Sequence, residues 1–164
     1  EDAYRGASRT IVLQQGDGTR TERVTIPPGV TEGQQLRMTG AGEPAQGGRR
    51  SGDLYLEVAM RPHRLYQVNG RDVTVTVPIA PGESALRPTI TVPTLGGPVE
   101  MRVPAGAQTG QRLRLRGRGL PGNPPGDEYV QLRLVTPPAD TPQARELYEQ
   151  MRRELPFDPR ADLK

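Results

Sequence analysis

One stretch of the sequence occurs twice. The segment Ile26–Pro44 reads IPPGVTEGQQLRMTGAGEP, and the segment Val103–Pro121 reads VPAGAQTGQRLRLRGRGLP, at a spacing of 77 residues. After a small difference in loop length, the match resumes in SGDLYLEV (Ser51–Val58) and PGDEYVQL (Pro125–Leu132). Because the shared positions are rich in glycine and proline, the chain is expected to turn at the same places twice. This internal duplication predicts two similar units in tandem.

The segments around the repeat carry the pattern of short β-strands. Apolar and polar residues alternate within them, and glycine and proline, 20 and 18 of the 164 residues, stand between them. We therefore expect an all-β chain of two tandem similar β-sandwich-like domains, residues 1–72 and residues 73–139. The sequence GDGT at Gly16–Thr19 predicts a hairpin turn. The expected strands are Arg9–Leu13, Arg20–Pro27, Gln34–Met38, Asp53–Met60, Asp72–Ile79, Pro88–Val92, Pro98–Pro104, Arg112–Arg116 and Asp127–Val135.

The two units differ in what precedes them. In the second unit the segment ESALRP (Glu83–Pro88) follows the predicted strand VTVTVPI, whereas the similar EDAYRG (Glu1–Gly6) stands at the beginning of the sequence. From this difference we expect the sequence to be part of a longer chain, in which a strand upstream of Glu1 belongs to the first unit.

A single amphipathic helix is predicted in the last part of the chain, residues 140–164. Thr141 is a suitable N-cap, Pro142 suits the first helical position, and Pro156 ends the helix. An apolar stripe follows the helical period. Its residues are Ala144, Leu147, Tyr148, Met151 and Leu155. The stripe either packs back onto its own sheet or pairs with a second copy of the chain, and its spacing alone does not decide between them.

Several classes of function find no support in the sequence. There is no cysteine, which excludes disulfides and thiolate zinc sites, and no apolar run approaches the roughly 18 residues of a membrane span. His63 is the single histidine, without a second ligand or a catalytic partner at a suitable spacing. We therefore expect a soluble cytoplasmic protein that is not an enzyme, holds no metal and does not bind membranes.

The glycine-rich segment GRGLPG (Gly117–Gly122) formally matches a dinucleotide-binding pattern. That pattern requires a helix to begin there, so that the helix N-terminus can hold the pyrophosphate. Here proline lies inside the motif and NPPGD follows it. The segment is therefore interpreted as a loop between strands, and no nucleotide or other cofactor is expected.

A row of arginines offers one possible binding surface. Arg112, Arg114, Arg116 and Arg118 alternate with smaller or apolar residues, which predicts four guanidinium groups along one face of one strand. Such a row suits a nucleic acid, but it is also what a solvated sheet face looks like. The segment carries no aromatic residue for base stacking, which favours the solvated face, and the basic nucleic-acid-binding protein remains the alternative hypothesis.

The first predicted strand offers a different surface. Ile11 and Leu13 share one face of it. If a neighbouring element leaves that face partly open, an extended peptide can add as a strand, with its side chains held by the apolar residues. The pattern fits ordinary core residues equally well.

Together the segments resemble the C-terminal substrate-binding region of DnaJ-type co-chaperones, over about residues 1–155. The segments that carry the resemblance are EDAYRGASRTI, IPPGVTEGQQLRMTGAGEP, GDLYLEV, PHRLYQVNGRDVTVTVPI, LGGPVEMRVPAGAQTGQRLRLRGRGLPG and GDEYVQLRLVTPP. The resemblance implies a pair of β-domains that hold unfolded client polypeptides, prevent their aggregation and deliver them to a DnaK-type ATPase chaperone. The sequence carries no His-Pro-Asp J-domain signature, and the short Glu43–Arg50 stands where some members insert a cysteine-rich zinc module, so the chain resembles the zinc-free subclass.

The resemblance also implies roles for particular residues. In the family the client groove lies in the first unit, and at the matching positions Ile11 and Leu13 would line it, with Tyr66 as an aromatic wall. Arg9 matches a basic position that meets the acidic C-terminal tail of the partner chaperone in some members. The terminal helix would form a homodimer through Leu147, Tyr148 and Met151. The resemblance favours a groove over a sealed core for Ile11 and Leu13.

Overall fold

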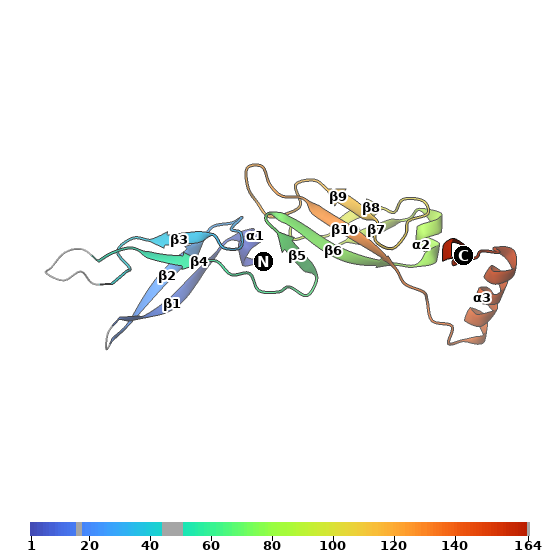
Figure 1. The fold of residues 1–164 in the computed structure, drawn as a ribbon, viewed down its shortest axis with the longest axis horizontal. Coiled ribbons are helices and arrows are strands. Elements are labelled where there is room, and N and C mark those ends of the chain that lie inside the picture. The colour runs from blue at the N-terminus through green and yellow to red at the C-terminus, as the bar shows by residue number, and fades with distance from the viewer. Residues whose placement is uncertain (16–17, 44–50, 164) are drawn as a thin grey trace.

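The computed structural model describes residues 1–15, 18–43 and 51–163 (Figure 1). The first positions of the predicted turn at Gly16–Thr19, and most of the short segment Glu43–Arg50, lie outside these described residues. In chain order the elements are α1 (Asp2–Arg5), β1 (Ala7–Gln15), β2 (Gly18–Ile26), β3 (Gln35–Met38), β4 (Leu54–Glu57), β5 (Tyr66–Asn69), β6 (Asp72–Ile79), α2 (Pro81–Leu86), β7 (Thr89–Val92), β8 (Val99–Arg102), β9 (Arg112–Leu115), β10 (Glu128–Leu134), α3 (Pro142–Glu154) and the 3-10 turn η1 (Ala161–Leu163).

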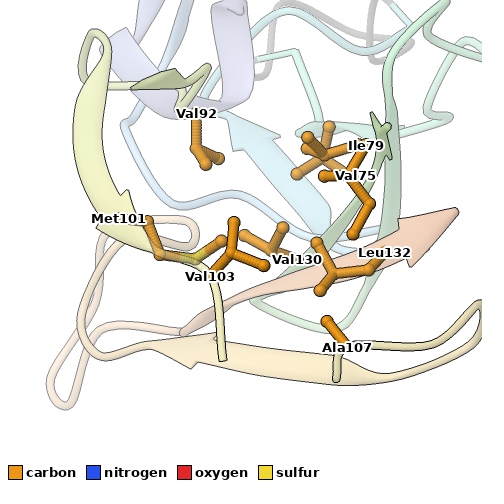
Figure 2. Packing of buried hydrophobic residues seen from close by; sticks show 9 residues of the cluster. Val75, Ile79, Val92, Met101, Val103, Ala107, Val130 and Leu132 are labelled. Carbon is orange, nitrogen blue, oxygen red and sulfur yellow. The ribbon is translucent and has the colours of Figure 1, made fainter. Parts of the chain in front are cut away.

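The second unit contains a four-stranded sheet and a hairpin. The sheet has the order β5-β6-β10-β9, in which β6 and β10 run parallel and the other pairs are antiparallel. The β7–β8 hairpin forms a separate antiparallel pair. Side chains from both packed layers meet in one apolar cluster, because alternate residues of each strand point inward (Figure 2). The buried residues of this cluster are Val75, Val77, Ile79, Val92, Met101, Val103, Ala107, Val130 and Leu132.

The first unit is built from two hairpins, β1–β2 and β3–β4. Its fully buried apolar residues among the described ones are few, namely Val24, Val30 and Ala41. The other inward-facing apolar side chains are only half-buried. These are Ile11, Leu13, Ile26, Leu36, Met38, Leu54 and Leu56. The duplicated sequence therefore carries a sealed core in the second unit and a thin one in the first.

The predicted duplication is confirmed strand by strand. Leu36 lies opposite Leu56 in the β3–β4 pair, and Leu113 lies opposite Val130 in the β9–β10 pair, at the same positions of the repeat. A short helix precedes the first strand of both hairpin layers, α1 before β1 and α2 before β7. The prediction of an all-β chain with two tandem similar units and a C-terminal helix is thus confirmed.

An aspartate fixes the turn that follows β3 and β9. Asp53 accepts hydrogen bonds from Arg37 Nε at 2.7 Å and from the backbone N–H of Gly40 at 3.0 Å. Asp127 accepts the equivalent bonds from Arg114 Nε and from the N–H of Gly117, each at 2.7 Å. The glycine N–H groups, followed by the arginines, hold the pKa of both carboxyls below the usual range. The repeated Arg, Gly and Asp positions therefore build the same clamp twice.

The division between the units differs from the predicted one. Strand β5 pairs with β6, with Tyr66 opposite Val75, so the predicted boundary between residues 72 and 73 falls inside a hairpin. The hydrogen bonding places β5 in the second sheet, and the division lies between β4 and β5. The strand β5 was not among the predicted strands, and of its four residues only Tyr66 is partly buried.

The helix α3 begins and ends close to the predicted limits. Thr141 is its N-cap and accepts a hydrogen bond from the N–H of Ala144 at 3.1 Å. The helix ends at Glu154, one residue before the last apolar position of the stripe. None of the helices in the described part of the chain has the length and apolar character needed to cross a bilayer.

The units meet at the turn formed by Pro28 and Gly29. A Cβ added at Gly29, which has a φ of +85°, would lie 2.1 Å from the carbonyl oxygen of Pro121 in the second unit. The Tyr4 hydroxyl of α1 similarly lies within 2.5 Å of the Cβ position of Gly96. A Cβ at either position would collide with these atoms, so both contacts depend on a glycine.

We predict that Gly29→Ala destabilises the chain more than Gly33→Ala. Both glycines have positive φ, which costs a non-glycine residue about 1–3 kcal/mol, but nothing lies within 4 Å of a Cβ at Gly33. The extra loss in Gly29→Ala therefore reports the contact with Pro121, and urea unfolding of the two variants measures it. Equal losses in both variants would show that the contact between the units is absent.

Candidate functional site

The strand β1 presents an apolar face and a free edge. Ile11 and Leu13 are half-buried and lie opposite Glu22 and Arg20 of β2, which form an ion pair with each other. Among the described residues β1 pairs with β2 alone, so its other edge has unpaired N–H and C=O groups. Val12 points to the opposite face and is 66% exposed. The strand thus combines unpaired backbone groups with two partly covered apolar side chains.

A hollow of about 320 Å³ lies between β2 and β3. The buried Val24 and Ala41 and the half-buried Leu36 and Met38 provide its apolar lining. Charged side chains of both strands also line it, and these are Arg20, Glu22, Arg23 and Arg37. No local sequence pattern reveals this hollow, because its walls come from two separate hairpins.

The corresponding faces of the second unit are closed. In the paired registers Val92 occupies the position of Ile11, because Val92 lies opposite Val99 as Ile11 lies opposite Glu22. Val92 is 0% exposed, whereas Ile11 is half-buried. The second unit has the valine-rich β6 beside β10, whereas β4 pairs only with β3 among the described residues. The apolar face is therefore open in the first unit and closed in the second, although both come from the same repeat.

The structure does not bring Tyr66 to Ile11 and Leu13. Tyr66 packs against the apolar cluster of the second unit, and its ring lies 4.9 Å from that of His63. His63 accepts hydrogen bonds at Nδ1 from the N–H groups of Leu65 and Tyr66, and its Nε2 lies 3.1 Å from Glu1 Oε1. Burial raises the pKa of Tyr66. Because β5 is a strand of the second sheet, the ring of Tyr66 packs in the second unit. Its neighbour His63 contacts Glu1, which places the ring close to the junction between the units.

Arg9 lies on the same face of β1 as Ile11 and Leu13. Its side chain is 62% exposed and forms an ion pair with Asp2 of α1, with Nε donating to Oδ2 at 3.0 Å. This hydrogen bond from Arg9 holds the pKa of Asp2 below its ordinary value. The guanidinium is therefore positioned beside the apolar face but remains open to solvent and to an incoming anion.

The apolar stripe of α3 faces its own chain only in part. Tyr148 is half-buried and its hydroxyl donates to the carbonyl oxygen of Pro137. Leu147 and Met151 remain 67% and 45% exposed. The three side chains line a hollow of about 250 Å³, together with prolines of the preceding segment and the beginning of α2. The stripe therefore packs only partly onto its own chain, and Leu147 and Met151 stay exposed.

The prediction of four arginines on one strand face is wrong. Strand β9 ends at Leu115, so Arg112 and Arg114 lie on it while Arg116 and Arg118 lie in the turn that follows. Arg114 pairs with Asp127, and Asp127 raises the pKa of the guanidinium. The guanidinium of Arg112 lies 4.5 Å from the ring centre of Tyr129. The sequence around Arg112 does not reveal this aromatic partner, because Tyr129 comes from the neighbouring strand β10.

Comparisons with known proteins found a family model and curated relatives that match most of the chain. Residues 1–137 match the family described as "DnaJ C terminal domain". The chain is 47% identical over 173 residues to the curved DNA-binding protein of Coxiella burnetii strain Dugway 5J108-111, covering 99% of this chain and 55% of that protein. It is 44% identical over 148 residues to the curved DNA-binding protein of Pseudomonas putida strain KT2440, covering 88% and 46%. The chain thus spans about half the length of the curated relatives that it matches.

Proposed function

The chain belongs to the DnaJ C-terminal domain family, and we propose that it is a client-binding region of a co-chaperone. The family supports a co-chaperone type of role rather than an enzymatic one. In the proposed function the chain holds non-native polypeptides in the first unit, prevents their aggregation and presents them to a DnaK-type ATPase chaperone.

The half-covered apolar face of β1 carries this proposal. An extended segment of a client pairs with the free edge of β1, and these backbone hydrogen bonds tolerate any sequence. Ile11 and Leu13 receive apolar side chains of the client, and each side chain that becomes covered contributes about 1.5–3 kcal/mol at most. Binding is therefore weak and unselective, as suits a protein that must release many different clients.

Arg9 supports the part of the proposal that concerns the partner chaperone. Its exposed guanidinium lies on the apolar face of β1, a strand with one free edge, and already binds one carboxylate, that of Asp2. An acidic tail that adds to the same edge exchanges this carboxylate for its own, because arginine pairs with carboxylates through two parallel hydrogen bonds. Tail and client then compete for β1, which provides a route to client release.

The double variant Ile11→Ser with Leu13→Ser tests the groove. We expect it to abolish the suppression of client aggregation, because both apolar contacts are lost, and to change the melting temperature little, because both residues are only half-buried. Light scattering of a thermally unfolding client measures the effect. Val12→Ser is the matched control on the other face of β1 and should keep full activity. Full activity of the double variant would refute the proposed groove.

We also propose that the chain forms homodimers through α3. Leu147 and Met151 are exposed apolar side chains in the apolar stripe of α3, and nearby Leu155 and Phe157 are 65% and 82% exposed. A twofold contact between two such helices covers the same patch on both copies. Dimerisation joins two weak client sites and so raises the apparent affinity for a long unfolded chain.

Leu147→Asp combined with Met151→Asp should convert the dimer into a monomer, because two charges would be buried in an apolar contact. Multi-angle light scattering across a concentration series measures the mass. Gln150→Asp adds the same kind of charge outside the apolar stripe and should leave the dimer intact. A wild-type chain that stays monomeric at every concentration would remove the proposal.

DNA binding at the outer face of β9 and β10 is a second candidate function. The relatives described above are named curved DNA-binding proteins. Arg112 lies against Tyr129, and Arg133 is exposed on the face of β10 that points away from the core. Such guanidinium groups bind phosphates, and an aromatic ring among them can stack on a base.

Arg112→Gln combined with Arg133→Gln tests the second candidate. If these residues contact phosphates, the slope of log K against log salt for duplex DNA becomes shallower by about 0.9 for each lost contact. Arg102→Gln removes an exposed arginine from β8, in the other layer, and should leave the slope unchanged. An unaltered slope in the double variant rules out this face as the DNA site.

A further inference from the structure

The core of the second unit contains a carboxylic acid. Glu128 is the first residue of β10, and strand alternation places its side chain on the same face as Val130 and Leu132. It is 0% exposed, and neither of its carboxyl oxygens has a hydrogen-bond partner. The corresponding residue of the first unit is Leu54. A buried acid thus occupies a position that the repeat fills with an apolar side chain.

The surroundings of Glu128 offer little to stabilise a negative charge. Its neighbours on the adjoining strands are Val73 of β6 and Leu115 of β9. Two ionisable groups lie nearby. Arg118 in the turn after β9 favours the charged form, whereas Tyr66 of β5 interacts with Glu128 and also with Glu1 at the junction between the units. One cation, itself exposed, therefore opposes the cost of burying the carboxylate.

We propose that Glu128 makes the second unit a pH-dependent switch. A proton on this carboxyl keeps the core of the second unit closed, and loss of that proton as the pH rises through neutrality loosens β9 and β10. The turn between these strands also carries Pro121, which contacts Gly29. The junction between the units loosens with it. This inference goes beyond the proposed function and does not depend on it.

The sign follows from proton linkage. Burial raises the pKa of Glu128 from 4.5 to about 7 in the folded chain, and Arg118 opposes this shift. A carboxyl with a raised pKa is most favourable for folding below its unfolded pKa, and that advantage is lost as the pH rises toward the folded pKa. The clamped Asp53 and Asp127 have lowered pKa values, so their contribution to stability changes only in acid. Glu128 thus acts in a separate window, between about pH 5 and 7.

The size of the pH effect on stability can be measured in β10. The unfolding equilibrium changes by up to about tenfold per pH unit for one proton, which amounts to roughly 50- to 100-fold between pH 5 and pH 8. Hydrogen exchange at the amides of Val130 and Leu132, corrected for the intrinsic rate, should show a loss of protection of this size in the wild-type chain. Glu128→Leu copies the residue of the first unit and should abolish most of the pH dependence.

Three further measurements keep the test decisive. Glu128→Gln keeps the shape of the side chain without its charge and should behave as Glu128→Leu does. Glu100→Gln changes an exposed carboxylate of the same unit and should keep the wild-type profile. A carbon NMR titration of the Glu128 carboxyl reports its protonation directly. A titration midpoint below pH 5, or parallel exchange profiles in the wild type and Glu128→Leu, would overturn the proposal.

Discussion

The difference between the two units depends on how completely the apolar faces of their strands are covered by other strands. In the second unit the valine-rich strand β6 lies parallel to β10, and the β7–β8 hairpin packs on the resulting sheet, so that Val92, Val103 and Val130 are fully buried. In the described part of the first unit, two hairpins face each other without such a strand, and Ile11 stays half-buried. Apolar surface left in water is unfavourable, and this is the driving force for capturing another polypeptide.

The turns fix the strand register in both units, although the apolar faces of the two units are covered to different extents. In each unit an aspartate binds an arginine and a glycine N–H, in the β3–β4 pair of the first unit and in the β9–β10 pair of the second. The open unit therefore has the same strand register as the closed one. A groove with fixed walls loses little conformational entropy when a client binds. Glu128 adds a different influence, because its carboxyl weakens the closed unit where the fold itself would favour leucine. The two units are thus similar in backbone and opposite in how their inner faces are used.

The duplicated sequence was sufficient to predict the fold class, most of the strands and the C-terminal helix, because turn residues and alternation are local properties. The strand β5 and the short helices α1 and α2 were not predicted. The sequence was also not sufficient to predict which sheet a short strand joins. Tyr66 follows the first unit in the sequence, yet β5 pairs with β6, and only the hydrogen bonding reveals this. The partner of Arg112 was also hidden, since Tyr129 comes from another strand. The burial of Glu128 was equally unpredictable, because an acid at a core-facing position looks in sequence like an exposed one.

The central claim is that the open face of β1 in the first unit receives extended polypeptide. The most direct test is the change in backbone amide NMR signals when an unfolded apolar peptide is added to the chain. Binding at this face predicts progressive shifts in β1 and in neighbouring β2, with β6 and β10 unchanged. Shifts confined to α3 or to the outer face of β9 and β10, with β1 unaffected, would contradict the claim.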